Sequence, residues 1–437
     1  ISALNSGADC YMTDFEDSLT PTFDNLMQGQ LNVKDAVNKK IDFIDQKSGK
    51  EYKLNEKTAV LIIRPRGLHL DEKNATIDGK RISGTFFDLG LSLFHNAKKL
   101  IENGSGPYFY LPKLEHYLEC RLLNEVILFC EKKLNLEVGT VKVTVLIETI
   151  NAVFQMDEFL WELKDHIVGL NAGRWDYLFS YQKVYRNTQK VILPDRSKVN
   201  MFVPFMANYN KLLVDTCHKR GAFGMGGMSA QVIAKANPKE INEKALAGVK
   251  KDKERESKQG NDGAWVAHPS LVQPVKNIFE KNFEGPNQLN KFNNAKISRR
   301  DLLDEPKIDN AITEQGVREN LNEGIEYMAF WKIGTGCCVV NYLMADAATC
   351  EVSRAQLWIW LKYKVKLNDG RTVDEILIDK LIKEELDKIN KRFETWKEKT
   401  GDKSLDSVSF EGAAKTFKDM ITKENFDDFL TLPLYEK

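Results

Sequence analysis

With 437 residues, the chain is long enough to bury a large core and to form two or three domains. Lysine plus arginine and aspartate plus glutamate both count 63, so no net charge favours nucleic acid or an anionic membrane as a partner. The longest apolar runs, at residues 59–63 and 143–147, are far shorter than the roughly 20 residues of a membrane-spanning helix. We therefore expect a soluble protein without either partner.

The chain start and the cysteines favour an intracellular protein. The first residues, ISALNSGADCYM, have neither an initiator methionine nor the basic-then-apolar pattern of a signal peptide, so we expect an internal start and no secretion. Seven cysteines are scattered without CxxC spacing, which favours reduced thiols over a zinc site or a redox motif. The sequence leaves the oligomeric state open.

Predicted strands alternate with predicted helices along the first 275 residues. The strands are short apolar runs at residues 9–14, 59–64, 108–112, 143–148, 167–171, 221–225 and 264–267. The helices between them are expected at residues 23–28, 86–102, 117–134, 152–163 and 202–220. This alternation predicts a parallel sheet with helical crossovers. Seven strands are one short of a (β/α)₈ TIM barrel, so we expect the first barrel strand upstream of residue 1.

The composition changes after about residue 275. Polar runs and a Gly-Pro-Asn turn favour a linker over residues 276–310. From residue 313 onward the pattern is helical throughout, with helices expected at 317–333, 347–365, 372–398, 409–420 and 425–430. We therefore expect a barrel at 1–275, a linker at 276–310 and a helical C-terminal domain at 311–437. The run KKDKERESK at 250–258 is interpreted as a solvated helical face without a function.

Charged side chains follow most of the predicted strands: Asp14, Glu16, Arg64, Lys113, Glu148, Asp176 and His268. In a parallel barrel the carboxyl ends of the strands share one face, so we expect these side chains to converge. Glu148 and Asp176 follow consecutive strands, which lie about 4.8 Å apart, so the two carboxylates can share one small cation. All-oxygen ligands favour Mg²⁺ or Mn²⁺ over zinc. The alternative for both acids is an ordinary salt bridge.

Four further features give weaker signals. The planar donor fork of Arg64 suits an α-keto acid, but it also suits a rim salt bridge to Asp14 or Glu16. His268 stands before a proline and is interpreted as structural. The glycines at 224, 226 and 227 indicate close backbone approach rather than a dinucleotide site. Asp346 precedes an amphipathic helix and by pattern alone is an N-cap.

Nine motifs follow one another along the stretch from Gly7 to about Tyr435: GADCYMTDFEDSLTPT, TAVLIIRPRGLHL, GSGPYFYLPKLE, VLIETI, KDHIVGLNAGRWDYLF, GMGGMSAQ, WVAHPSLV, GPNQL and LMADAATCEVSRAQLW. With these motifs the chain resembles the malate synthases, the condensing enzymes of the glyoxylate cycle, in their shorter form. Two residues depart from the family pattern. Ala345 stands where the family has Glu beside the base, and Leu68 stands where it has Trp.

The resemblance implies a magnesium site and a set of catalytic residues. Glu148 and Asp176 would hold Mg²⁺, with Asp14 and Glu16 in its water shell. Glyoxylate would bind the metal, Arg64 and backbone N–H groups of the loop from Gly173 through Trp175 to Asp176. The C-terminal domain would supply the base, Asp346. Pro269 and Met344 match positions near the adenine end of acetyl-CoA.

The implied reaction is a Claisen-type condensation. Asp346 would remove a methyl proton from acetyl-CoA, the enolate would attack glyoxylate, and hydrolysis of malyl-CoA would give malate and CoA. The partners would be small molecules, and the compartment a glyoxysome or peroxisome in a eukaryote or the cytoplasm in a bacterium. Two alternatives remain: a lyase-type relative that cleaves malyl-CoA-like thioesters, and a non-catalytic acyl-CoA-binding protein on the same scaffold.

Overall fold

The structure is a computed structural model that describes residues 1–45, 49–189, 192–303, 310–401 and 405–436. The chain forms two compact units. The first, called the strand unit, comprises Ile1–Glu16, Pro21–Arg174 and Tyr209–Lys296. The second, called the helical unit, comprises Asp17–Thr20, Trp175–Asn208 and Ile297–Lys437. The predicted division at residues 275 and 310 stays a prediction, and residues 304–309 of the predicted linker lie outside the described ranges.

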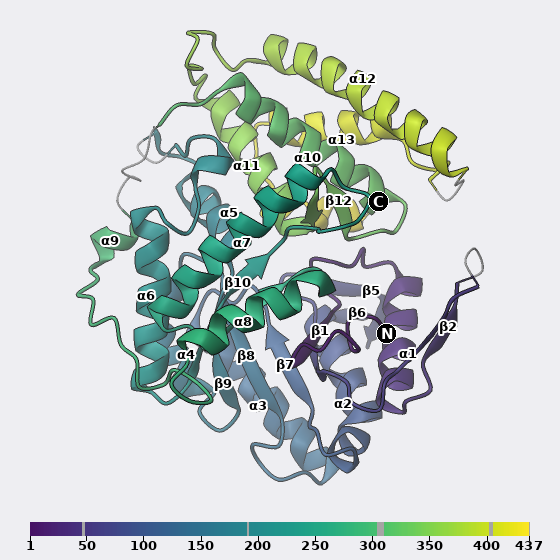
Figure 1. Ribbon diagram of the computed structural model, residues 1–437, viewed down its shortest axis with the longest axis vertical. Helices are drawn as coiled ribbons and strands as arrows, with labels where there is room; N and C mark the ends of the chain where they lie inside the picture. The colour runs from purple at the N-terminus through teal and green to yellow at the C-terminus, as the bar shows by residue number, and fades with distance from the viewer. Residues whose placement is uncertain (46–48, 190–191, 304–309, 402–404, 437) are drawn as a thin grey trace. The chain divides into compact units, whose positions relative to one another are not determined.

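The strand unit contains a parallel sheet in the order β1-β4-β7-β8-β9-β10-β11 (Figure 1). Its strands are β1 Cys10–Asp14, β4 Val60–Arg64, β7 Tyr108–Leu111, β8 Lys142–Ile147, β9 Ile167–Ala172, β10 Phe223–Ser229 and β11 Gly263–Val266. Each lies within a few residues of a predicted strand, so the seven predictions are confirmed. Because all neighbours are parallel, the carboxyl ends of the strands share one edge of the sheet.

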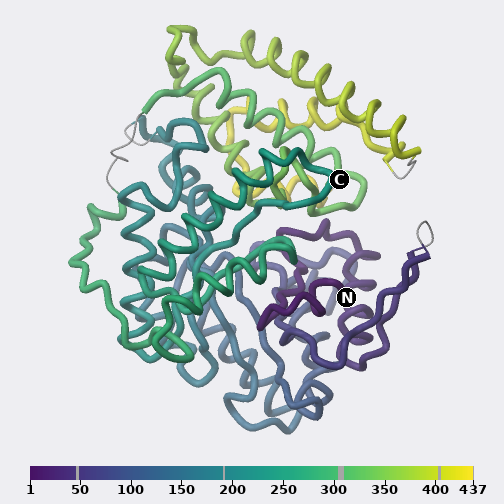
Figure 2. The backbone as a smooth tube through the Cα atoms, viewed as in Figure 1, coloured from purple at the N-terminus to yellow at the C-terminus, as the bar shows by residue number. Residues whose placement is uncertain are grey.

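Helices connect consecutive strands, as the backbone trace in Figure 2 shows between the purple and teal segments. They are α1 Phe23–Val37, α2 Gly84–Glu102, α3 Tyr117–Leu134, α4 Met156–Glu162, α6 Pro204–Lys219 and α7 Lys239–Gln259, and a further helix, α8 Val272–Asn282, follows the last strand. The predicted end of α1 at residue 28 is wrong. Gly29 lies inside the helix and does not end it. A Cβ at this position would be 2.7 Å from the Phe15 ring, so packing against that ring requires the glycine.

The prediction of a solvated face at residues 250–258 is also wrong. Three polar residues of this run, Lys253, Glu256 and Ser257, are buried in α7 with exposures of 0%, 1% and 0%. Together with Val249 they lie at helical spacing, so they form one face of α7 that turns inward. Within this face Lys253 Nζ lies 2.8 Å from Glu256 Oε2, so the two buried charges are paired.

Short hairpins were not predicted. They are β2 Asp42–Ile44 with β3 Glu51–Lys53, β5 Asp71–Ile77 with β6 Lys80–Ser83, and β12 Cys338–Val340 with β13 Leu343–Ala345. The last hairpin contradicts the prediction that everything after residue 313 is helical. Asn341 and Tyr342 both have positive φ, 48° and 66°, which suits the tight turn of a two-residue hairpin. Three-residue strands are too short to give a clear alternating pattern.

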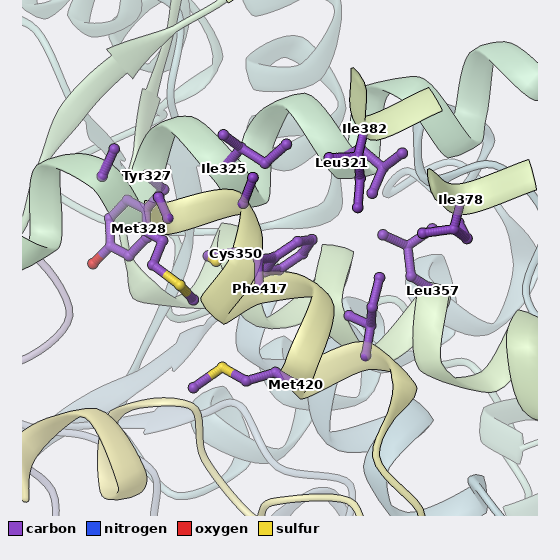
Figure 3. Close-up of a cluster of buried hydrophobic side chains, with 14 of the residues drawn as sticks. Leu321, Ile325, Tyr327, Met328, Cys350, Leu357, Ile378, Ile382, Phe417 and Met420 are labelled. Carbon is purple, nitrogen blue, oxygen red and sulfur yellow. The ribbon is translucent and has the colours of Figure 1, made fainter. Parts of the chain in front are cut away.

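The helical unit is built on α5 Arg174–Tyr185, α9 Arg299–Leu303, α10 Glu314–Lys332, α11 Ala347–Lys362, α12 Glu375–Thr400, α13 Phe410–Thr422 and α14 Thr431–Tyr435. Its core joins α10, α11, α12 and α13 through residues such as Leu321, Leu357, Ile378 and Phe417 (Figure 3). Phe417 packs so closely on α10 that a Cβ at Gly324 would be 2.1 Å from its ring.

The predicted helix at residues 425–430 is wrong, since the last helix is α14. The N–H of Leu430 donates to Glu351 Oε1 at 2.5 Å, and the carbonyl of Asp427 accepts from Arg354 at 3.0 Å. These bonds to buried side chains of α11 use backbone groups that a helix would pair internally. None of the described helices combines the length and apolar character that crossing a membrane requires.

A buried histidine ties α6 to the segment after α8. His218 Nε2 lies 2.9 Å from Asp262 Oδ2, and its Nδ1 lies 2.6 Å from the Lys291 carbonyl oxygen. Burial lowers the pKa of His218, but the hydrogen bonds with Asp262 and Lys291 outweigh it, so the net pKa is raised above 6.5. The doubly protonated ring is therefore the form that the fold favours.

A pH dependence of stability follows. Because the folded-state pKa is the higher one, the contribution of His218 is complete below about pH 6.5 and is lost as the pH rises through the folded-state pKa. His218→Gln should lower the free energy of unfolding by about 1–3 kcal/mol at pH 6, and by less at pH 9. Urea unfolding at the two pH values measures this difference, and a deficit that grows with pH would contradict it.

Candidate active site

Arg64 ends β4 opposite Asp14 in the parallel register with β1. Its Nε donates to Asp14 Oδ1 at 2.7 Å, a second guanidinium nitrogen pairs with the other carboxylate oxygen of Asp14, and Nη1 lies 3.5 Å from Glu16 Oε2. Arg64 and Glu16 are each only 5% exposed. The rim salt bridge that the sequence left as an alternative is therefore present, and it holds the donor fork of Arg64 in one orientation.

Lys113 connects this ion pair to Glu148. Its backbone N–H donates to Glu148 Oε1 at 2.7 Å, and its ammonium pairs with Glu16. The residue follows β7 with a positive φ of 56°, a conformation that costs a lysine energy. Such a cost at a strand end is typical of functional sites, because surrounding contacts must enforce it. The sequence placed Lys113 among the strand-end residues but gave it no role.

Glu148 and Gly173 follow the neighbouring strands β8 and β9. Glu148 is 1% exposed. A Cβ at Gly173 would lie 2.7 Å from Glu148 Cβ and 2.8 Å from its Oε2. Only glycine therefore fits beside this carboxylate, which fixes how close the end of β9 approaches Glu148.

The charged groups of the strand unit suit a hard cation better than a soft one. Glu148, Asp14 and Glu16 supply carboxylate oxygens, which are hard ligands, and they lie in one network with Arg64 and Lys113. Within the described ranges, no group of three or more His, Cys, Asp or Glu has the arrangement of a metal site. Mg²⁺ is usually held by one or two carboxylates together with water and substrate, so this donor set fits magnesium.

A cluster of three hydrogen-bonded side chains, Tyr110, Asn171 and Trp265, lies next to Arg64 inside the sheet. The sequence did not indicate this cluster. The guanidinium carbon is 5.8 Å from the centre of the Trp265 ring, and Trp265 Nε1 donates to Tyr110 Oη at 3.0 Å. Asn171 Nδ2 reaches the same hydroxyl at 3.5 Å. Burial raises the pKa of Tyr110, so its hydroxyl stays neutral. The three side chains come from β7, β9 and β11, and nothing in the local pattern of any one strand predicts their contact.

In the helical unit, Asp346 is the N-cap of α11. Its Oδ1 accepts the Thr349 N–H at 3.2 Å, and Thr349 Oγ1 accepts the Asp346 N–H at 3.3 Å. The N-cap that the pattern indicated is confirmed. The next residue, Ala347, donates its N–H to the Asp17 carbonyl at 3.1 Å, and Tyr327 Oη donates to the same carbonyl at 3.3 Å. The start of α11 is thus held by both a side chain and backbone.

Trp175 and Asp176 lie in the first turn of α5, which begins directly after β9. Asp176 is 7% exposed. The Trp175 ring lies 5.0 Å from the guanidinium carbon of Arg196, whose Nη1 donates to Ser353 Oγ at 2.7 Å. Arg196 therefore links this turn to α11. The sequence did not indicate Arg196.

The predicted site residues divide between the two units. The strand unit brings together Asp14, Glu16, Arg64, Lys113, Glu148 and Gly173. The helical unit holds Trp175, Asp176, Met344 and Asp346. His268 caps the short helix of Pro269–Leu271, with Nδ1 2.7 Å from Ser270 Oγ, which agrees with a structural role. Pro269 is exposed, and Met344 lies half-buried in β13.

Comparison with known proteins confirms the resemblance seen in the motifs. The family model described as malate synthase, TIM barrel domain, matches residues 60–305, and the one described as malate synthase, C-terminal, matches residues 311–437. A malate synthase from Myxococcus xanthus is 46% identical over 437 residues, which cover 100% of this chain and 79% of that protein. A glyoxysomal malate synthase from Cucumis sativus is 44% identical, with coverage of 100% and 77%.

A solved structure shares the fold. The ternary complex of Haloferax volcanii malate synthase with pyruvate and acetyl-CoA superposes with a TM-score of 0.54 at 13% identity, over 82% of this chain and 83% of that one. The barrel architecture predicted from the alternating strands and helices is confirmed by this likeness and by the family model. The chain belongs to the malate synthase family.

Proposed function

We propose that this enzyme condenses acetyl-CoA with glyoxylate and hydrolyses the malyl-CoA product to malate and CoA, with Glu148 and Asp176 as Mg²⁺ ligands and Asp346 as the base. One observation carries the proposal. In a chain with 44–46% identity to malate synthases over its whole length, the charged residues at the carboxyl ends of β1, β4, β7 and β8 form one buried network around Arg64 and Glu148.

Asp346 and Arg64 would carry the enolisation of acetyl-CoA. Asp346 takes a proton from the methyl group, and Arg64 stabilises the negative charge that develops on the thioester oxygen. The bond from Thr349 N–H to Asp346 Oδ1 supports this role, because it fixes the orientation of the carboxylate. Asp14 and Glu16 already hold the Arg64 guanidinium in place, so Arg64 need not rearrange when the charge develops.

Glyoxylate would bind to Arg64 and to the backbone N–H groups from Gly173 to Asp176. These groups open α5, and the first turn of a helix favours an anion because its N–H groups point outward along the helix dipole. When bound, Mg²⁺ would polarise the aldehyde as a Lewis acid and orient it for attack. Asp14 and Glu16 are proposed to face the water shell of the ion, and Lys113 keeps Glu148 in position through its N–H.

Acetyl-CoA is proposed to place its adenine end near Pro269 and Met344. The departures at Ala345 and Leu68 concern local geometry: Ala345 is 1% exposed in β13, one residue before the base, and Leu68 follows the Arg64 loop. The helical domain that carries Asp346 favours a synthase over a lyase-type relative. The relatives from Cucumis sativus and Candida tropicalis are named glyoxysomal, so we propose a glyoxysome or peroxisome in a eukaryote and the cytoplasm in a bacterium.

Release of the free CoA thiol tests the proposal. The protein is incubated with acetyl-CoA and glyoxylate, with Mg²⁺ or with excess chelator, and the thiol is measured by its reaction with an aromatic disulfide. Thiol release that requires both substrates and Mg²⁺ is the expected result. A lyase would leave the thioester intact, and a non-catalytic acyl-CoA-binding protein would consume neither substrate, so either outcome rejects the proposal.

A further inference from the structure

Helix α7 carries a buried ion pair that the proposed mechanism does not use. Lys253 Nζ lies 2.8 Å from Glu256 Oε2, and the two residues are 0% and 1% exposed. Asp252 Oδ2 lies 3.4 Å from the same ammonium, and Arg255 lies 3.3 Å from Glu256 Oε1. Removing charges from water costs energy that their mutual attraction often does not recover, so stability alone explains such a pair poorly.

The pair binds both peptide groups of one glycine at the end of β10. Lys253 Nζ donates to the Gly227 carbonyl at 2.6 Å, and the Gly227 N–H donates to Glu256 Oε1 at 3.1 Å. The register between β10 and β11 shifts between Met225 and Met228, so Gly227 lies in a bulge. A bulge leaves backbone groups without their sheet partners, and a cation beside an anion supplies both a donor and an acceptor there.

The bulge in turn contacts the end of β9. Asn171 Nδ2 donates to the Gly226 carbonyl at 3.0 Å, and a Cβ at Gly227 would be 3.0 Å from the Ala172 carbonyl oxygen. The residue after Ala172 is Gly173. Its backbone lies so close to Glu148 that an added Cβ would be 2.7 Å from Glu148 Cβ. A continuous chain of contacts thus runs from α7 through β10 and β9 to Glu148.

We propose that Lys253 and Glu256 are positioning residues that fix the carboxyl ends of β10 and β9 and thereby the geometry of Glu148 toward its cation and glyoxylate. The inference rests on the proposed function, because it assigns Glu148 to the cation. The fold offers a contrasting buried pair. Glu131 Oε2 lies 3.1 Å from His166 Nε2, and Glu131 Oε1 accepts the Val141 N–H just before β8, at the amino end of the sheet. In barrels that end serves stability.

Two changes disturb the α7 pair in different ways. The double variant Lys253→Met with Glu256→Gln removes both charges together and leaves no unpaired buried ion. Gly226→Ala removes no charge, but its Cβ would be 2.3 Å from Glu256 Oε2, so the carboxylate must move. Lys253→Arg keeps a cationic donor and serves as the conservative variant. Glu131→Gln disturbs the pair at the amino end and is the matched control.

The readouts are the dissociation constant of Mn²⁺ alone, by electron paramagnetic resonance, the KM values for glyoxylate and acetyl-CoA, and the unfolding temperature. Partners behind a ligand typically change metal affinity about 10- to 100-fold. We expect the double variant and Gly226→Ala to weaken Mn²⁺ binding about tenfold and to raise the glyoxylate KM similarly, with the acetyl-CoA KM nearly unchanged. Lys253→Arg should restore most of the affinity, and Glu131→Gln should lower only the unfolding temperature.

The outcomes distinguish failure of the proposed function from failure of the positioning role of Lys253 and Glu256. If the unaltered protein fails to bind Mn²⁺ or to release thiol, the proposed function is rejected. If it does both, and the double variant or Gly226→Ala binds Mn²⁺ as tightly as it does, the positioning role is overturned. The role is also overturned if Glu131→Gln weakens Mn²⁺ binding equally. Should the double variant not fold, Gly226→Ala alone decides between these results.

Discussion

Replacement of Asp346 by Asn is expected to lower kcat for CoA release by about 10²- to 10⁴-fold, the range that a positioned general base contributes. The amide cannot accept the methyl proton of acetyl-CoA at neutral pH. The same change should leave the free energy of unfolding nearly unchanged, because Asn and Asp are equally good N-caps and the amide oxygen can still accept the Thr349 N–H. Steady-state thiol release and urea unfolding measure the two quantities.

A second N-cap in the same unit provides the control. Asp374 caps α12, and its Oδ1 accepts the Leu377 N–H at 2.8 Å. Asp374→Asn should change neither activity nor stability. If Asp346→Asn keeps full activity, the assignment of the base is wrong. If it loses activity and stability together, the loss reflects a disturbed start of α11 rather than missing base chemistry.

The sequence predicted the strands of the sheet well because most are short apolar runs between breakers, and β8 and β9 are buried over most of their length. It predicted helix ends less well where tertiary contacts decide them. Gly29 inside α1 resembles a helix stop, yet it is needed for the Phe15 ring. Residues 425–430 resemble a helix, yet Glu351 and Arg354 take their backbone groups. In both cases the partner is remote in sequence and leaves no local signal.

The candidate site shows the same division. The acids and Arg64 at strand ends could be predicted, because a parallel sheet gathers the carboxyl ends of its strands at one edge. The left-handed backbone of Lys113 and the contact of Tyr110 with Trp265 could not, because they depend on the register between strands. The charged run at 250–258 differs from its prediction for a related reason. A charged helical face is usually solvated, and the partner that buries Lys253 is the backbone of Gly227, which has no side chain to indicate it.

The two interpretations of Arg64 turn out to be compatible. An arginine in solvent would lose rotamer freedom on binding a substrate, which costs up to about 2 kcal/mol. In the structure, Asp14 and Glu16 already hold the fork. The ion pair therefore supplies the rigidity that stabilisation of a developing charge requires, since donors that need no reorganisation are the effective ones.

Gly173→Ala tests the proposed cation site at Glu148 by adding a single methyl group beside its side chain. The new Cβ would be 2.7 Å from Glu148 Cβ, which is fixed by the backbone and cannot rotate away, so the end of β8 or β9 must move. The φ of Gly173 lies outside the left-handed region, and alanine is therefore allowed by the backbone itself. Because a displacement of about 1 Å can cost about 10²-fold, we expect kcat/KM for glyoxylate to fall by about that factor, with weaker Mn²⁺ binding.

Gly248→Ala is the matched control, because no atom of the residues that the structure describes lies within 4 Å of its Cβ position on α7. It should leave kcat/KM unchanged and add about 0.5–1 kcal/mol to the free energy of unfolding, since alanine loses less backbone freedom in a helix than glycine. Gly173→Ala should instead lower that free energy by about 1–3 kcal/mol through overpacking. A variant that is destabilised to this extent but retains both Mn²⁺ affinity and glyoxylate KM would contradict the proposed site, because either Glu148 or the Gly173 end of β9 must shift and both are assigned to it.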